Sequence, residues 1–117
     1  MTKVTTTKIE ALDALQEMEN IIESLYNRRL DGEEIQPYII TAQRYRDKIT
    51  TYILEHAKET SQRKEIVSLL KAIEDFIIEI YEKHLYGEEL KPYINIAQNY
   101  KQPIEKYIKE QIRNNNR

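Results

Sequence analysis

The sequence repeats itself after 55 residues, and this repeat constrains the fold more than any other feature. Residues 22–55 align without gaps with residues 77–110, and 16 of the 34 paired positions are identical. Solenoids need three or more units to bury a continuous core, so two copies favour a pseudo-twofold domain. A chain of 117 residues also has the size of one domain. We therefore expect a single domain over residues 1–117, with repeat units at 7–60 and 61–115.

Each repeat unit has the pattern of a helical hairpin. Residues 7–10, Thr-Lys-Ile-Glu, match a capping box, which starts a helix by satisfying free backbone N–H groups. We expect this first helix to end near Leu30, with Gly32 in the left-handed conformation that closes many helices. Pro37 is then suited to open the second helix, where its missing N–H costs nothing. The second unit repeats the plan, with a helix from about Ser61 to Tyr86 and another from Pro92.

The link between the two units leaves two architectures open. Residues 56–65, HAKETSQRKE, contain neither glycine nor proline. Thr60 or Ser61 can cap a separate third helix. Alternatively, the second and third helices form one helix of about 50 residues, which favours a swapped or elongated dimer. No sustained alternation predicts strands. The expected fold is all-α, an antiparallel four-helix bundle built from two tandem hairpins of about 55 residues.

Tyrosines dominate the aromatic content, with nine tyrosines, one phenylalanine and no tryptophan. Six of them form two ladders with a spacing of seven residues: Tyr38, Tyr45, Tyr52 and Tyr93, Tyr100, Tyr107. At 100° per residue, each ladder forms one edge of its helix's apolar stripe. In one interpretation the rings are buried and the hydroxyl groups reach water. In the other, they line a groove that binds a protein, or that stacks on bases beside arginines.

Two basic residues, Arg46 and Lys101, occupy matching repeat positions inside the apolar stripes. Their side chains either extend to water along the helix surface or make a symmetric pair of contacts with carboxylates or other anions. Pro103 takes the place of Lys48 and predicts a kink in the fourth helix.

The first and third helices have apolar faces wider than a bundle helix needs, which indicates contacts on both sides, either within the bundle or with another chain. We interpret the surplus as evidence for a homodimer or a partner helix. Three isoleucines off the stripe centres are candidates for that contact: Ile40, Ile78 and Ile96.

No pattern of residues indicates catalysis, a cofactor or a metal. The chain has no cysteine, its two histidines lack zinc or di-iron spacing, and no phosphate-binding glycine loop is present. The net charge of −2 gives no general attraction to nucleic acid or membranes, and no apolar run is long enough to span a bilayer.

We therefore expect a cytoplasmic, non-enzymatic module for protein–protein interaction, assembly or regulation that forms a homodimer or binds another protein. The alternative is a nucleic-acid-binding accessory protein that uses Tyr38, Tyr45, Tyr52, Arg44 and Arg46 with their second-half counterparts.

Overall fold

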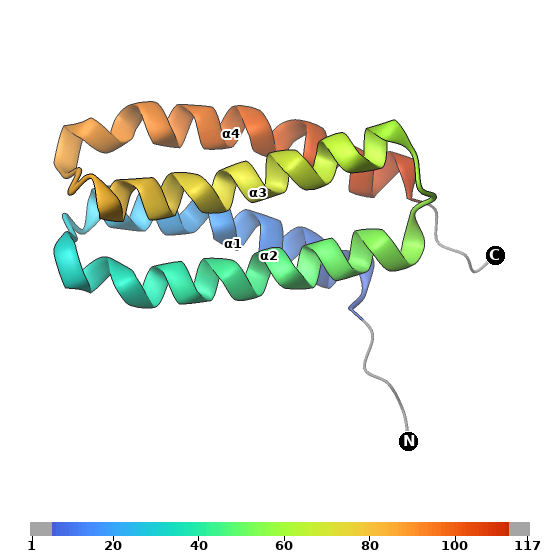
Figure 1. The fold of residues 1–117 in the computed structure, drawn as a ribbon, viewed down its shortest axis with the longest axis horizontal. Coiled ribbons are helices and arrows are strands. Elements are labelled where there is room, and N and C mark those ends of the chain that lie inside the picture. Colours follow the sequence, from blue (N-terminus) through green and yellow to red (C-terminus); the bar gives the residue numbers. More distant parts are fainter. Residues whose placement is uncertain (1–5, 113–117) are drawn as a thin grey trace, which may run out of the picture.

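The computed structural model describes residues 6–112 and confirms the all-α bundle (Figure 1). Within this range there are no strands. Four antiparallel helices follow one another up and down, and the last closes against the first (Figure 1). The helices are α1 (Lys8–Asn27), α2 (Gln36–His56), α3 (Ser61–Glu82) and α4 (Lys91–Lys106). Short 3₁₀ turns precede α2 (η1, Gly32–Ile35) and α4 (η2, Gly87–Leu90), and a π-helix follows α4 (η3, Tyr107–Gln111). The outer residues of the predicted domain, 1–5 and 113–117, lie outside the described range.

Side-chain caps fix where the helices begin. In the predicted capping box, the Glu10 N–H donates to Thr7 Oγ1 over 3.1 Å and the Thr7 N–H donates to Glu10 Oε1 over 3.0 Å. Thr60 caps α3 by accepting from the Arg63 N–H at 3.1 Å. The backbone is extended at Ala57 (φ −109°, ψ 149°), so α2 and α3 are separate helices. In the single chain the second and third helices are therefore not continuous, and the dimer that we associated with a continuous helix stays a prediction.

The first and third helices end about one turn earlier than predicted. The left-handed residues that close them are Arg29 (φ +54°) and His84 (φ +56°), not Gly32. The Leu30 N–H reaches back to the carbonyl of Leu25 over 3.1 Å, which completes a Schellman motif. This motif turns the chain early because it brings the apolar Leu30 back against the end of α1. Gly32 also has a positive φ, but it opens the following 3₁₀ turn.

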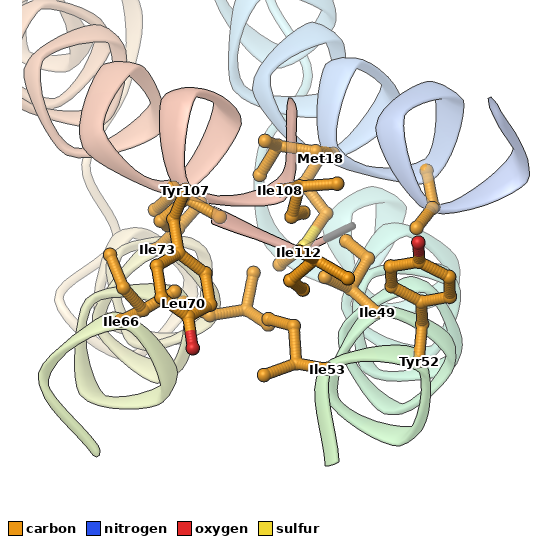
Figure 2. Packing of buried hydrophobic residues seen from close by; sticks show 14 residues of the cluster. Met18, Ile49, Tyr52, Ile53, Ile66, Leu70, Ile73, Tyr107, Ile108 and Ile112 are labelled. Atoms are coloured by element: carbon orange, nitrogen blue, oxygen red, sulfur yellow. The ribbon is translucent and has the colours of Figure 1, made fainter. Parts of the chain in front are cut away.

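The core runs the length of the bundle in two clusters. One lies at the end where α2 turns into α3 (Figure 2), and the other lies at the end that holds η1 and η2. Isoleucine and leucine supply most of the fully buried side chains, for example Leu15, Ile53 and Leu70. Burial of this apolar surface holds the four helices together.

The fourth helix is the irregular one. It stays α-helical across Pro103 and becomes a π-helix at Tyr107, where the Ile112 N–H donates to the Tyr107 carbonyl over 3.2 Å. The corresponding helix α2 stays α-helical to His56. The helix is thus irregular one turn after the proline, and the kink at Pro103 itself stays a prediction.

Candidate protein-binding surface

The two tyrosine ladders are graded in burial along their helices. Tyr52 and Tyr107 belong to the core, with 2% and 4% of their surfaces exposed (Figure 2). Burial raises the pKa of both phenols. The other four ladder residues are half-buried: Tyr38, Tyr45, Tyr93 and Tyr100. Each ladder is therefore a boundary between core and surface, and only its half-buried members can contact another molecule.

The first tyrosine of each ladder is held by charged side chains of its own half. Arg28 Nη1 donates to the Tyr38 hydroxyl oxygen over 2.6 Å. The Tyr93 hydroxyl donates to Glu79 Oε2 over 2.6 Å, and Lys83 Nζ donates to the same oxygen over 2.8 Å. The hydrogen bond to Glu79, aided by burial, raises the pKa of Tyr93. The bonds from Lys83 and Tyr93 lower the pKa of Glu79.

The two basic residues inside the apolar stripes form a symmetric pair of ion pairs. Arg46 Nε contacts Glu74 Oε1, and Lys101 Nζ lies 3.3 Å from Glu19 Oε1. The acids are buried, with 3% exposure for Glu74 and 7% for Glu19. Of the two sequence hypotheses, carboxylate contact describes the structure, and both cations are engaged within the chain.

Sequence reasoning missed Glu19 and Glu74, although a signal was present. The two glutamates are 55 residues apart, the same repeat distance that separates Arg46 from Lys101. Each also stands among the apolar residues that face the core, where an unpaired carboxylate would be costly. A charge at matching positions on all four apolar faces predicts two pairs, but only the fold shows which base meets which acid.

The three candidate isoleucines do not form one patch. Ile40 on α2 is 53% exposed and Ile96 on α4 is 37% exposed, whereas Ile78 on α3 is half-buried. Ile96 lies one turn from both Tyr93 and Tyr100 on the same side of α4. It therefore joins an aromatic cluster, and Ile40 does not.

That cluster lies between α3 and α4. The Phe76 ring contacts the rings of Tyr93 and Tyr100, with centroids 5.9 and 5.5 Å away. Further along the same groove, a hollow of about 430 Å³ opens between the start of α3 and the end of α4. Leu69 and Pro103 line it. We define the α3–α4 face by six residues: Leu69, Phe76, Tyr93, Ile96, Tyr100 and Pro103.

The first half of the chain provides an internal comparison for this face. The residues 55 positions earlier, on α1 and α2, are Ala14, Ile21, Thr41 and Lys48, where the second half has Leu69, Phe76, Ile96 and Pro103. At each position the second half carries the larger or the more apolar side chain. Ala14 and Ile21 are also buried, whereas Leu69 and Phe76 are half-exposed. In this groove the second half is thus the more apolar one, whereas elsewhere the first half exposes the isolated apolar residues Ile9, Ile40 and Leu54.

Two exposed charges flank the hollow in the α3–α4 face. Glu65 near the start of α3 and Lys106 at the end of α4 both line it. Within residues 6–112, neither side chain has an ion-pair or hydrogen-bond partner. The two edges of the face therefore carry opposite, uncompensated charges at the same end of the bundle.

A second hollow of about 420 Å³, at the end where α2 turns into α3, is lined largely by polar residues. It includes His56, whose Nδ1 lies 3.0 Å from the Tyr52 carbonyl and whose ring stacks on the Tyr52 ring at 4.4 Å. Among the described residues, no group of three or more histidine or acidic side chains could hold a metal ion. No helix in residues 6–112 is long and apolar enough to cross a membrane.

Fold and surface together define a four-helix bundle with an aromatic groove between α3 and α4. Comparison with protein-family models, with curated proteins and with solved structures finds no match to this chain.

Proposed function

We propose that this protein is a non-enzymatic assembly module that binds a second copy of itself through the α3–α4 face. The supporting observation is the internal comparison: at four matching positions, the second half exposes larger or more apolar side chains than the first. Such surface is retained at a cost in solubility, and contiguous apolar patches mark interaction sites. Half-buried tyrosines at its edge fit an interface, where aromatic residues are enriched. The absence of cysteine fits a cytoplasmic location.

Charge complementarity favours a second copy as the occupant. A twofold axis between two such faces, parallel to the helices, brings α3 of one copy over α4 of the other. Glu65 of each copy then lies opposite Lys106 of its partner, because both residues stand at the same end of the bundle. A twofold interface of this kind is self-complementary. It also compensates two charges that have no partner within residues 6–112.

Nucleic acid is a less favoured ligand than a second copy, because most cations beside the tyrosines already have partners within the chain. Arg46 forms an ion pair with Glu74, and Arg28 donates a hydrogen bond to the Tyr38 hydroxyl oxygen. Arg29 Nη2 lies 3.9 Å from Glu88 Oε2. Binding to phosphates would have to break these contacts. We expect no quenching of tyrosine fluorescence by single-stranded oligonucleotides at low salt. Quenching that weakens steeply with added salt would favour the nucleic-acid hypothesis instead.

Sedimentation equilibrium of matched variants tests the proposed dimer. Ile96→Thr installs the first-half residue and removes on the order of 1 kcal/mol of apolar burial per copy. Because a twofold dimer contains the residue twice, we expect the dissociation constant to rise roughly 30-fold. Ile40→Thr is the control, since this isoleucine is exposed on α2, outside the face. A wild-type chain that stays monomeric, or equal effects of the two variants, would contradict the proposal.

Charge reversal tests the identity of the occupant. Glu65→Lys and Lys106→Glu should each weaken self-association, because each places like charges opposite one another. The double variant should restore it, since the charges are then exchanged but still complementary. If the double variant is weaker than either single variant, these residues do not meet across a twofold axis.

A further inference from the structure

The contacts between the two halves of the bundle come in reciprocal pairs. Arg46 of the first half meets Glu74 of the second, and Lys101 of the second half meets Glu19 of the first. Positions 46 and 101 correspond in the repeat, and so do positions 19 and 74. The two ion pairs are therefore equivalent, with the roles of the two halves exchanged. Each half therefore presents an acid from its first helix and a base from its second.

A second set of contacts, nearer the η1 and η2 end, has the same relation. Gln36 Nε2 donates to the Tyr81 hydroxyl oxygen over 2.7 Å, and Lys91 Nζ lies 5.7 Å from the centre of the Tyr26 ring. Positions 36 and 91 correspond in the repeat, as do positions 81 and 26. The same reciprocity thus holds at two levels along the bundle.

Reciprocal contacts of this kind define an isologous interface, in which residue i meets j and j meets i. In a homodimer such an interface joins two chains, and here it joins two halves of one chain. The surface of each half is complementary to the other half, whether that half belongs to the same chain or to a second copy. Nothing in these contacts requires the two halves to belong to the same chain.

The segment that joins the halves is short and open to rearrangement. Residues 57–60, Ala-Lys-Glu-Thr, are mostly exposed, and the backbone is extended at both ends of the segment. The segment has no glycine or proline to impose a turn, and alanine, lysine and glutamate favour helix. The side-chain hydrogen bonds that hold it come from Arg63 of α3: its N–H donates to Thr60 Oγ1 over 3.1 Å, and its Nη1 donates to the Ala57 carbonyl over 3.3 Å.

We infer that the two halves exchange between two copies of the chain, so that residues 8–56 of one copy pair with residues 61–112 of the other. The exchanged dimer re-forms each interface of the closed bundle and differs from it only in residues 57–60. Chain concentration and the conformation of this segment therefore set the balance between the two forms. The inference rests on the contacts between halves and not on the α3–α4 face.

Two complementary charge variants test the exchange in the full chain. The first carries Arg46→Glu and Lys101→Glu, and the second carries Glu19→Lys and Glu74→Arg. Alone, each variant places two like-charged pairs inside the bundle. Mixed, they restore opposite charges at all four contacts, but only if each bundle takes one half from each variant. Both variants also carry Ile96→Thr, so that association through the α3–α4 face is weakened roughly 30-fold.

The mixture should form a one-to-one heterodimer with twice the 14.1 kDa mass of the chain. Its melting temperature should lie about 10–20 °C above that of either variant, because two buried like-charge contacts are removed per bundle. Light scattering and circular dichroism after joint refolding measure the two quantities. Equal melting temperatures of the mixture and the separate variants, with no heterodimer, would overturn the inference.

Deletion of residues 57–60 tests it independently of the charge changes. Without this segment α2 runs directly into α3, and one chain cannot fold back on itself. We expect a discrete dimer that keeps the wild-type helical content, again in the Ile96→Thr background. A monomer, or a chain that loses its helical content, would contradict the exchange. Failure of the α3–α4 dimer alone leaves both expected results unchanged.

Discussion

Removing Arg46 should destabilise the fold strongly, because it leaves a buried carboxylate without its partner. Glu74 is almost fully buried and faces Arg46 Nε in the groove between α2 and α3. Loss of one partner of a buried ion pair costs about 3–5 kcal/mol. Arg46→Met keeps much of the apolar stem and removes only the charged end. The equivalent change Lys101→Met should cost less, because Glu19 is less deeply buried and still accepts from Gln16 Nε2 at 3.3 Å.

Urea unfolding followed by circular dichroism measures these free energies of unfolding. A double-mutant cycle then separates the interaction energy of the ion pair from the cost of burying one charge without its partner. Arg46→Met combined with Glu74→Leu replaces both charges with apolar groups, which is often neutral or stabilising. We therefore expect the double variant to recover most of the stability lost in Arg46→Met. The reasoning would be refuted by additive losses in the double variant, or by a loss in Lys101→Met that equals the loss in Arg46→Met.

Three further predictions concern single features of the fold. His84→Gly should stabilise the protein by about 1 kcal/mol, because glycine adopts the positive φ of this position without strain. Thermal unfolding measures the effect, and an unchanged or lower melting temperature would show that His84 is not strained. The pKa of Glu79 lies below the ordinary value of 4.5, so its contribution to stability is present above that pH and is lost as the pH falls through the folded pKa. Glu79→Gln should therefore reduce the decrease of the urea unfolding midpoint at acid pH. A midpoint with unchanged pH dependence would count against the bonds that Lys83 and Tyr93 donate to Glu79. The pKa values of Tyr52, Tyr93 and Tyr107 all lie above 10.0, so these tyrosines should contribute to the late phase of an alkaline titration of tyrosinate absorbance. Tyr52→Phe with Tyr107→Phe should reduce the amplitude of that phase, and an unchanged amplitude would contradict the role of burial.

The features that sequence predicted are those encoded by neighbouring residues. The capping box at Thr7 and the start of α2 beside Pro37 depend on groups only a few positions apart. The left-handed position at the end of α1 was misplaced because Gly32 is the obvious residue for it, whereas the contact of Leu30 with the helix end decides the geometry.

The features that sequence could not supply depend on which helices become neighbours. Arg46 and Lys101 were identified as charges in an apolar stripe, but their partners stand on helices of the other half. The apolar surplus of the α3–α4 face was equally hidden. The repeat displays the substitutions Thr41 to Ile96 and Lys48 to Pro103, but it does not place them in one groove beside Phe76.

The two halves differ in a pattern that separates the interior from the surface. Where the halves face each other, charge is matched: an acid stands at 19 and 74, and a base at 46 and 101. A change of sign at any one of these positions would bury two like charges, so the fold itself restrains them. The six residues of the α3–α4 face include no charged residue, so no such ion pair restrains them. The α3–α4 face could therefore become apolar and aromatic, while the matching positions on α1 and α2 hold smaller or more polar residues: Ala14, Ile21, Thr41 and Lys48. A repeated bundle can in this way keep matched charges between its halves while the outward grooves of its two hairpins diverge.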